Sequence, residues 1–249
     1  MTEEVFSAKP RQSAAGTVYE RVKRGGARFW RHSDFAGLPP AAVAMALSRL
    51  AREGVLQRTA KGVYYRPAPS AFGPSIAGAS AAAAQTLNAP LHPAGLSAAN
   101  LLGLTTQNPG RAEYATSVAG PPTALRDAVI HTGRSAQRAS LSAEDGAILE
   151  TLRERARASD LSPQDTVRRL LVLLADEKRF RRLAAAAIGE PPRVRAMLGA
   201  LGEELSMSSR LLDELRGSLN PLSRYDFGRL ESLRYAKQWQ AKQASQLLL

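Results

Sequence analysis

The most regular pattern of apolar and polar positions lies in residues 40–53. Apolar side chains recur there at the spacing of one helical face, namely Val43, Ala46, Leu47 and Leu50. The opposite face holds five other residues, namely Ala42, Met45, Ser48, Arg49 and Arg52. Pro40 suits the first turn of a helix, and Gly54 suits its end. The pattern therefore predicts a helix with an apolar back and a polar front.

Shorter patterns flank this helix. In chain order they predict a helix at residues 17–24, a strand at 28–31, a short helix at 34–35 capped by Ser33, and strands at 55–59 and 63–66. Residues 60–62 join the two strands, because glycine supplies the positive φ that a tight turn can demand. Helix, strand, helix, helix and hairpin is the order of a winged helix-turn-helix, a DNA-binding fold.

Beyond residue 70 the pattern changes twice. Mixed elements come first, with helices at 75–87 and 97–102 and strands at 89–92, 112–117 and 128–133. Helices then dominate, at 142–158, from Ser162 to a break at 189–192, and at 193–205, 208–219 and 225–247. We therefore expect an α+β protein with an N-terminal winged helix-turn-helix, a mixed α/β middle segment and a mostly helical C-terminal region. The expected domains are residues 1–70, 71–205 and 206–249.

The charge distribution adds a ligand class to this picture. The 249-residue chain has a formal net charge of +12, which favours polyanions such as nucleic acid. Residues 1–70 hold 12 Lys and Arg against 5 Asp and Glu, so more than half of the excess lies in less than a third of the chain. The predicted winged helix is therefore where a polyanion is expected to dock.

Candidate DNA contacts follow from this placement. On the front of the predicted helix, Ser48 and Arg49 are the candidates for base contacts. The candidates for phosphate contacts lie around the helix and the hairpin, namely Arg31, Arg52, Arg58 and Lys61. Residues 39–42 offer no bidentate donor to a base edge, although apolar contact with thymine methyl groups is open to them. Protein docking is the alternative use of such a small module.

Other function classes find little support. The chain has no cysteine and only three histidines, which stand far apart, and no nucleophile, phosphate-loop or dinucleotide-binding motif is visible. We expect no enzyme activity, no cofactor and no metal. No apolar stretch reaches the length that crosses a membrane, and the N-terminus lacks a signal-peptide pattern, so a cytoplasmic protein is expected.

The last predicted helix carries aromatic residues, namely Tyr225, Phe227, Tyr235 and Trp239. Their spacing leaves three roles open: packing inside the protein, binding a protein partner, or adding a second nucleic-acid face. The Leu-rich residues 170–174 are expected to be core, because apolar helical stripes are normally used that way.

Two segments resemble a known family. The sequence DFAGLPPAAVAMALSRLAREGVLQRTAKGVYYRP is similar to the N-terminal winged helix of the AbiEi-type antitoxins. HPAGLSAANLLGLTTQNPG, followed by AEYATS, resembles the start of the adjoining antitoxin domain. The likeness spans about residues 15–140 and is loose beyond Ser142. The apolar turn at 38–42 and the tail after Ser206 depart from the family pattern.

This resemblance implies a type IV toxin-antitoxin system. An antitoxin of this kind represses its own operon by binding inverted repeats in double-stranded operator DNA, and counteracts a nucleotidyltransferase-like toxin. The helix at residues 41–53 and the wing around Lys61 would face the DNA. Residues 71–205 would be an antitoxin-like α+β domain, and 206–249 a helical extension. A winged-helix regulator without an antitoxin role is the alternative.

Overall fold

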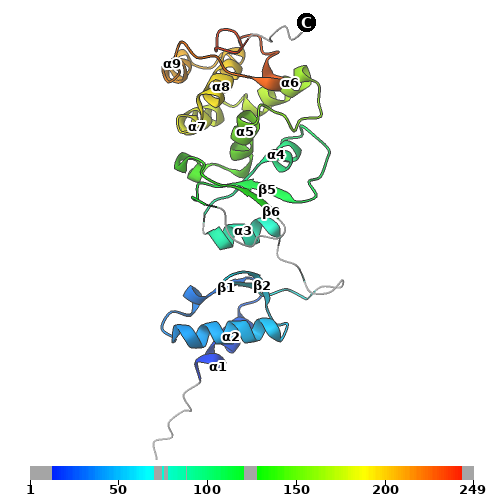
Figure 1. The fold of residues 1–249 in the computed structure, drawn as a ribbon, viewed down its shortest axis with the longest axis vertical. Helices are drawn as coiled ribbons and strands as arrows, with labels where there is room; N and C mark the ends of the chain where they lie inside the picture. The colour runs from blue at the N-terminus through cyan, green and yellow to red at the C-terminus, as the bar shows by residue number, and fades with distance from the viewer. Residues whose placement is uncertain (1–12, 70–74, 76–77, 88, 121–127, 243–249) are drawn as a thin grey trace, which may run out of the picture. The chain divides into compact units, whose positions relative to one another are not determined.

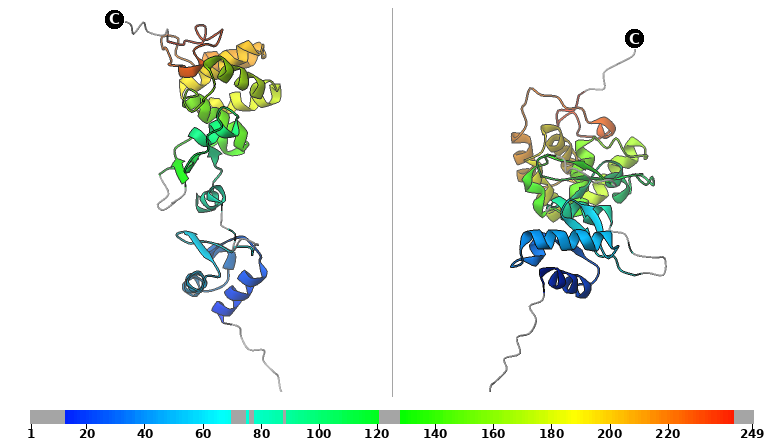
Figure 2. Two further views of the ribbon diagram at one scale, coloured as in Figure 1. Left: turned by 90° about the vertical axis from the view of Figure 1, so that its right-hand side faces the viewer. Right: turned by 60° about the horizontal axis from the view of Figure 1, so that its bottom comes forward.

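The protein folds as two compact units, Met1–Thr86 and Leu87–Leu249, which we call the winged-helix unit and the C-terminal unit. The structure is a computed structural model that describes residues 13–69, 75, 78–87, 89–120 and 128–242 (Figures 1 and 2). The expected fold class is confirmed: an α+β chain with an N-terminal winged helix, small sheets and a C-terminal region dominated by helices.

The winged-helix unit contains a small antiparallel sheet of order β1-β3-β2. Its elements are α1 (Ala14–Arg24), β1 (Phe29–Arg31), the 3-10 helix η1 (His32–Phe35), α2 (Pro40–Arg52), β2 (Gln57–Ala60), β3 (Val63–Tyr65) and α3 (Ala79–Leu87). Helices α1 and α2 lie on one side of the sheet (Figure 1). The short turn between β2 and β3 contains Gly62 at a φ of 76°, a conformation that glycine adopts without strain.

One apolar core holds this unit together. Val18 and Val22 of α1 pack with the apolar stripe of α2 and with Trp30 and Phe35, whose rings stack 5.4 Å apart. At the start of α1 the Ser13 side chain accepts a hydrogen bond from the Gly16 amide, which satisfies one of the free donors of the first turn. The unit therefore keeps α2 in place by burying its back.

The predicted capping of the short second helix was wrong. Ser33 lies inside the 3-10 helix, and the carboxylate of Asp34 accepts the Arg31 amide at 2.7 Å instead. An aspartate side chain reaches back to the chain entering the helix and carries a charge that strengthens the hydrogen bond. The short 3-10 helix is therefore capped by Asp34, a residue of the helix itself, and not by Ser33.

The C-terminal unit combines a second small sheet with a bundle of helices. The sheet, of order β4-β5-β6, contains β4 (His92–Pro93), β5 (Ala112–Ala115) and β6 (Ala128–His131). The helices are α4 (Gly95–Leu101), α5 (Ala143–Arg153), α6 (Pro163–Leu174), α7 (Glu177–Ala187), α8 (Pro192–Glu204) and α9 (Ser209–Gly217), with 3-10 helices η2 (Ala136–Ser140) and η3 (Gly228–Leu230). Strand β5 pairs antiparallel with β4 and parallel with β6. Helix α5 lies between two groups of elements. One group is α4 and the sheet, and the other is α7 and α8 (Figures 1 and 2).

The predicted long helix after Ser162 is two helices. Helix α6 ends at Leu174, and α7 begins after Asp176, whose side chain accepts the Arg179 amide at 2.6 Å. The break changes the direction of the chain, so that Leu170 and Phe180 both enter one core. An aspartate cap inside a continuous helical pattern is the cause.

The predicted helix at 225–247 was also wrong in the part that the structure describes, and residues 243–249 lie outside it. Apolar side chains there recur every third residue and are buried, namely Phe227, Leu230, Leu233, Ala236 and Trp239. Backbone hydrogen bonds join each of the last four to the one three residues earlier. A repeat of three suits successive 3-10 turns rather than an α-helix. The aromatic side chains of Phe227 and Trp239 therefore pack inside the protein.

The segment after Ser206 shares the core of the C-terminal unit. Leu212, Phe227 and Trp239 belong to the same buried cluster as Leu149 of α5 and Leu198 of α8. The chain divides into its two compact units between Thr86 and Leu87, whereas the sequence predicted divisions after residues 70 and 205.

Candidate nucleic-acid interface

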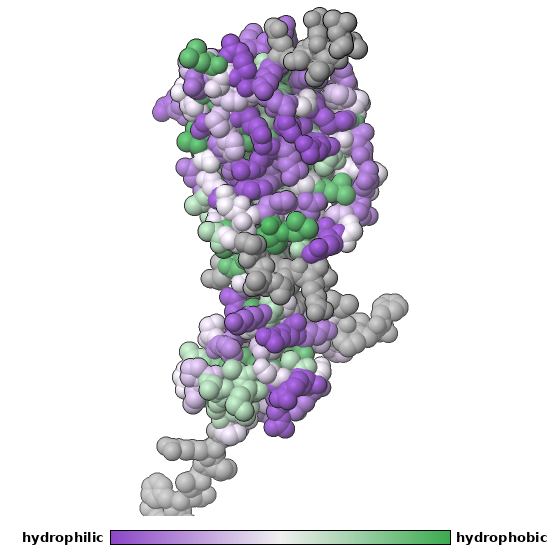
Figure 3. Space-filling model, viewed as in Figure 1, coloured by the Kyte–Doolittle hydropathy of each residue, from purple (hydrophilic) through white to green (hydrophobic). Residues whose placement is uncertain are grey.

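Helix α2 turns one face inward and leaves the other open. Its apolar stripe is buried, namely Val43, Ala46, Leu47 and Leu50. On the open face the exposed residues are Ala41, Ser48, Arg49, Arg52 and Met45, which is 73% exposed. Figure 3 shows pale green side chains gathered on the winged-helix unit with purple ones beside them. The predicted division of α2 into two faces is confirmed.

Ser48 links the open face to the wing. Its hydroxyl lies 3.2 Å from the hydroxyl of Tyr64, which is buried on β3. Tyr64 stands opposite Arg58 in the pairing of β2 with β3, and directly opposed residues share one face of a sheet. The contact between Ser48 and Tyr64 therefore connects a predicted base-contacting residue of α2 to the strand that pairs with Arg58, a predicted phosphate-contacting residue.

Arg49 lies at the other edge of the open face and has a partner. Its Nε donates to the Glu53 carboxylate at 2.8 Å, and this hydrogen bond with its opposite charge raises the pKa of Arg49. Both residues line a cleft of about 340 Å³ between α1 and α2, together with Ser13 and Tyr19. Arg49 must therefore leave Glu53 before it can contact a base.

Three further cations lie at the end of α2 and in the hairpin that follows it, namely Arg52, Arg58 and Lys61, and we call them the cation border. Arg52 ends α2, Arg58 lies on β2, and Lys61 precedes Gly62 in the wing turn. All three are exposed, and none of their side chains makes an ion pair or a hydrogen bond with another residue in the described part of the chain. Uncompensated cations beside an open helix face are suited to phosphate groups.

Arg31 lies apart from this group. It is half-buried on β1, which pairs with β3 at the edge of the sheet opposite to β2. Its amide donates to Asp34, and its side chain also takes part in interactions of the unit. The predicted phosphate contacts are therefore split between two edges of the sheet.

Sequence reasoning missed two features of this surface. The Arg49–Glu53 pair has the i,i+4 spacing of a helical ion pair, so the sequence contained the signal. The contact of Ser48 with Tyr64 joins residues 16 positions apart and depends on how the wing packs on α2. No local pattern could have indicated it.

The C-terminal unit contains a buried charge network. Arg134 donates to Glu150 at 2.8 Å, Arg138 donates to Glu190 at 2.7 Å and also pairs with Glu150, and Arg153 reaches Glu190 at 3.0 Å. Burial alone would raise the pKa of Glu150, but hydrogen bonds and charges from Arg134 and Arg138 outweigh it and lower the pKa. The charge of each buried carboxylate is compensated by two arginines. The same ion pairs connect η2 to α5 and to the chain after α7.

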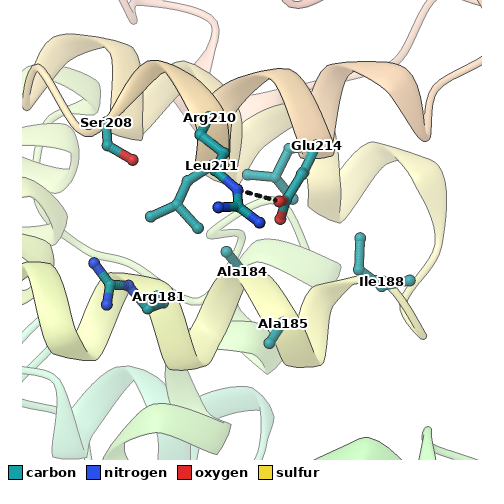
Figure 4. A pocket seen from close by; sticks show the side chains of 9 residues that line it. Arg181, Ala184, Ala185, Ile188, Ser208, Arg210, Leu211 and Glu214 are labelled. Atoms are coloured by element: carbon teal, nitrogen blue, oxygen red, sulfur yellow. Dashed lines mark hydrogen bonds and ion pairs between the residues drawn. The ribbon is translucent and has the colours of Figure 1, made fainter.

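A surface cleft of about 420 Å³ lies between α7 and α9 of the same unit (Figure 4). Its floor is apolar, formed by Ala184, Ala185, Ile188, Leu211 and Leu215. Arg181 and Arg210 border it, and each is paired on its own helix, with Glu177 at 2.8 Å and with Glu214 at 3.3 Å. The cleft therefore combines an apolar floor with borders whose arginines are ion-paired.

Candidate reaction chemistry is sparse in the described ranges. His131 on β6 lies 3.2 Å from the Glu113 carboxylate, and burial together with the charge of Glu150 raises the pKa of nearby Glu154. Among the described residues no cluster of three or more His, Asp or Glu could hold a metal ion. Within the same ranges no helix is long and apolar enough to span a membrane.

Comparison with known protein families finds a match for part of the chain. Residues 20–126 match a family of unknown function, DUF6088. The match covers less than half of the 249 residues. The chain is also similar to the crystal structure of the RV2827C protein from Mycobacterium tuberculosis, with a TM-score of 0.46 and 18% identity over 86% of this chain and 85% of that chain. No protein with a curated description matches the sequence. None of these findings names an antitoxin.

Proposed function

We propose that this protein is a DNA-binding regulator that places α2 in the major groove of a DNA duplex and the β2–β3 wing along its backbone. The observation that carries the proposal is the cation border, whose three residues are exposed and have no counterion in the described part of the chain. Arg52 ends α2, and Arg58 and Lys61 lie in the hairpin that contacts α2 through Tyr64 and Ser48. A recognition helix needs a buried back and an open front, and α2 has both.

Phosphate contacts would supply most of the affinity. Each neutralised phosphate releases condensed counterions, so the logarithm of the binding constant falls by about 0.9 per contact for each unit increase in the logarithm of salt concentration. Three border cations would therefore contribute a slope of about −2.7. The wing would add this affinity without regard to sequence, and α2 would read the bases.

The sequence resemblance extends the proposal to a cellular role. We propose a cytoplasmic antitoxin and transcriptional autorepressor of a type IV toxin-antitoxin operon, which binds operator DNA and counteracts a nucleotidyltransferase-like toxin. The support for this extension is the likeness of residues 34–67 and 92–117 to AbiEi-type antitoxins. The C-terminal unit would counteract the toxin, and the protein would act by binding, without a cofactor.

A binding titration tests the proposal. The full chain is titrated against duplex DNA from upstream of its own gene and against a scrambled duplex, each at two salt concentrations. We expect tighter, salt-sensitive binding to the upstream duplex. Failure to bind either duplex at low salt would overturn the proposal.

Variants assign the contacts. Lys61→Ala is expected to weaken binding to both duplexes alike and to reduce the salt slope by about 1. Arg49→Ala is expected to weaken binding to the upstream duplex more, provided that Arg49 leaves Glu53 in the complex. Arg210→Ala removes the same charge from an exposed position on α9 and serves as the matched control.

The alternative is a protein-docking module, and one observation favours it. Met45 is 73% exposed at the centre of the open face, where an apolar partner could cover it. A complex that forms without DNA and persists in high salt would support this alternative.

A further inference from the structure

The open face of α2 has two unlike halves. Its N-terminal half begins with Pro39 and Pro40, has no side-chain cap, and exposes Ala41 and then Met45. These side chains contain no hydrogen-bond donor to a base edge, and the only heteroatom among them is the weakly accepting sulfur of Met45. Polar side chains begin only at Ser48. The first turns of α2 can therefore contact a ligand through apolar atoms.

Met45 is an unusual side chain to leave in water. Among the described residues of the winged-helix unit, the large apolar side chains that are exposed are Met45 at 73% and Tyr19 at 42%. Tyr19 lies on α1, in the cleft beside Arg49. Met45 alone projects from the open face of α2, and its flexible chain can adapt to an apolar group of irregular shape.

The surroundings of Met45 indicate the chemistry of the ligand. Arg52, Arg58 and Lys61 border the face without counterions in the described ranges, while Glu53 is occupied by Arg49. An apolar centre with a cationic border complements a ligand that is apolar in the middle and anionic at its edges. The major groove of DNA has this form, because phosphates line its walls and thymine places a C5-methyl group on its floor.

We propose that Ala41 and Met45 contact thymine C5-methyl groups, so that the preferred DNA site has thymines where the start of α2 enters the groove. This inference rests on the proposed DNA-binding function and adds its sequence preference. Ala41 and Met45 are one turn apart, a rise of about 6 Å along the helix. Two base-pair steps span about 6.8 Å, so the pair can reach thymines that are two base pairs apart.

Replacing thymine by deoxyuridine tests the contact directly. The full chain first selects its preferred duplex from a randomised library, and the thymines of that duplex are then replaced by deoxyuridine. This change removes only the methyl groups and keeps every hydrogen-bonding group of the base edge. We expect about fourfold weaker binding for each contacted methyl group.

Two variants locate the contact on the protein. In Met45→Ala the difference between the thymine and deoxyuridine duplexes should shrink, because the side chain that senses the methyl group is gone. Val172→Ala is the matched control, since Val172 is a 63% exposed apolar residue on α6 of the C-terminal unit. It should leave both affinities unchanged. Circular dichroism checks that both variants fold, as expected for exposed positions.

The outcomes separate this inference from the proposed function. Equal affinity of the unmodified protein for both duplexes, with salt-sensitive binding retained, would overturn the methyl contact and leave DNA binding intact. A full deoxyuridine effect in Met45→Ala would overturn the role of Met45. No binding to any duplex at low salt would overturn both proposals together.

Discussion

Gly199 of α8 lies where a larger side chain has no room. A Cβ atom added there would overlap three atoms of the Trp239 ring. Trp239 is 1% exposed, and its indole N–H donates to Glu203 at 3.1 Å while the Arg216 guanidinium lies 4.7 Å from the ring centroid. Gly199→Ala therefore tests whether the chain after Ser206 is an integral part of the C-terminal unit.

The expected magnitude is the difference of two effects. Carbon atoms in contact lie about 3.5–4.0 Å apart, so the Trp239 ring would have to retreat by on the order of 1 Å. Overpacking of a core costs about 1–3 kcal/mol. Alanine favours the helical backbone over glycine by about 1 kcal/mol. The net loss in the free energy of unfolding is therefore expected to be about 0–2 kcal/mol.

Urea unfolding followed by Trp239 fluorescence measures this loss. Trp30 reports the winged-helix unit, so the comparison is made in a Trp30→Phe background. Gly217→Ala at the end of α9 is the control, because a Cβ there meets no atom within 4 Å. The control should be neutral or slightly stabilising. A Gly199→Ala protein stabilised by about 1 kcal/mol, which is the helical gain of alanine with no overpacking cost, would refute the close packing of Trp239 on α8.

Three other changes have expected outcomes. Arg138→Met leaves two buried carboxylates without this partner and should cost about 3–5 kcal/mol in urea unfolding, whereas an unchanged midpoint would contradict the network. Burial lowers the pKa of His92, and the net effect of its surroundings lowers that of Glu150, so both bind fewer protons when folded. The C-terminal unit should therefore lose stability as pH falls below 6.5, the ordinary value for His92, and lose more below 4.5 for Glu150. Urea midpoints that are equal at neutral and acidic pH would exclude this linkage. Glu53→Gln releases Arg49 from its ion pair and should tighten DNA binding at low salt by a few fold, and weaker binding would argue against a role for Arg49.

Local periodicity was enough to predict the elements of the winged helix. The apolar stripe of α2 repeats at helical spacing, and its members are buried as expected. A glycine between two short β-rich runs placed the hairpin turn within residues 60–62. These features are determined by residues a few positions apart, so a sequence pattern contains them.

The tail after Ser206 contains a periodic pattern of apolar residues that is compatible with more than one kind of helix. Apolar residues repeat every third position from Phe227 to Trp239, which favours 3-10 turns over an α-helix. Charged and polar residues between them also suit an amphipathic helix. The choice between the two depended on whether the repeat was counted as 3.0 or 3.6 residues.

The sequence by itself determined the order of elements in the winged helix, the two faces of α2 and the concentration of positive charge in residues 1–70, because each depends on neighbouring residues. Only the tertiary structure decided that Ser48 meets Tyr64, that Trp239 packs on Gly199, and that Arg31 lies on the opposite sheet edge from Arg58. The two contacts join residues 16 and 40 positions apart, and only the packing of the chain selects them from many possible pairings. The open face of α2 combines both kinds of information: its residues follow from helical spacing, and its cationic border follows from the way the wing folds beside it.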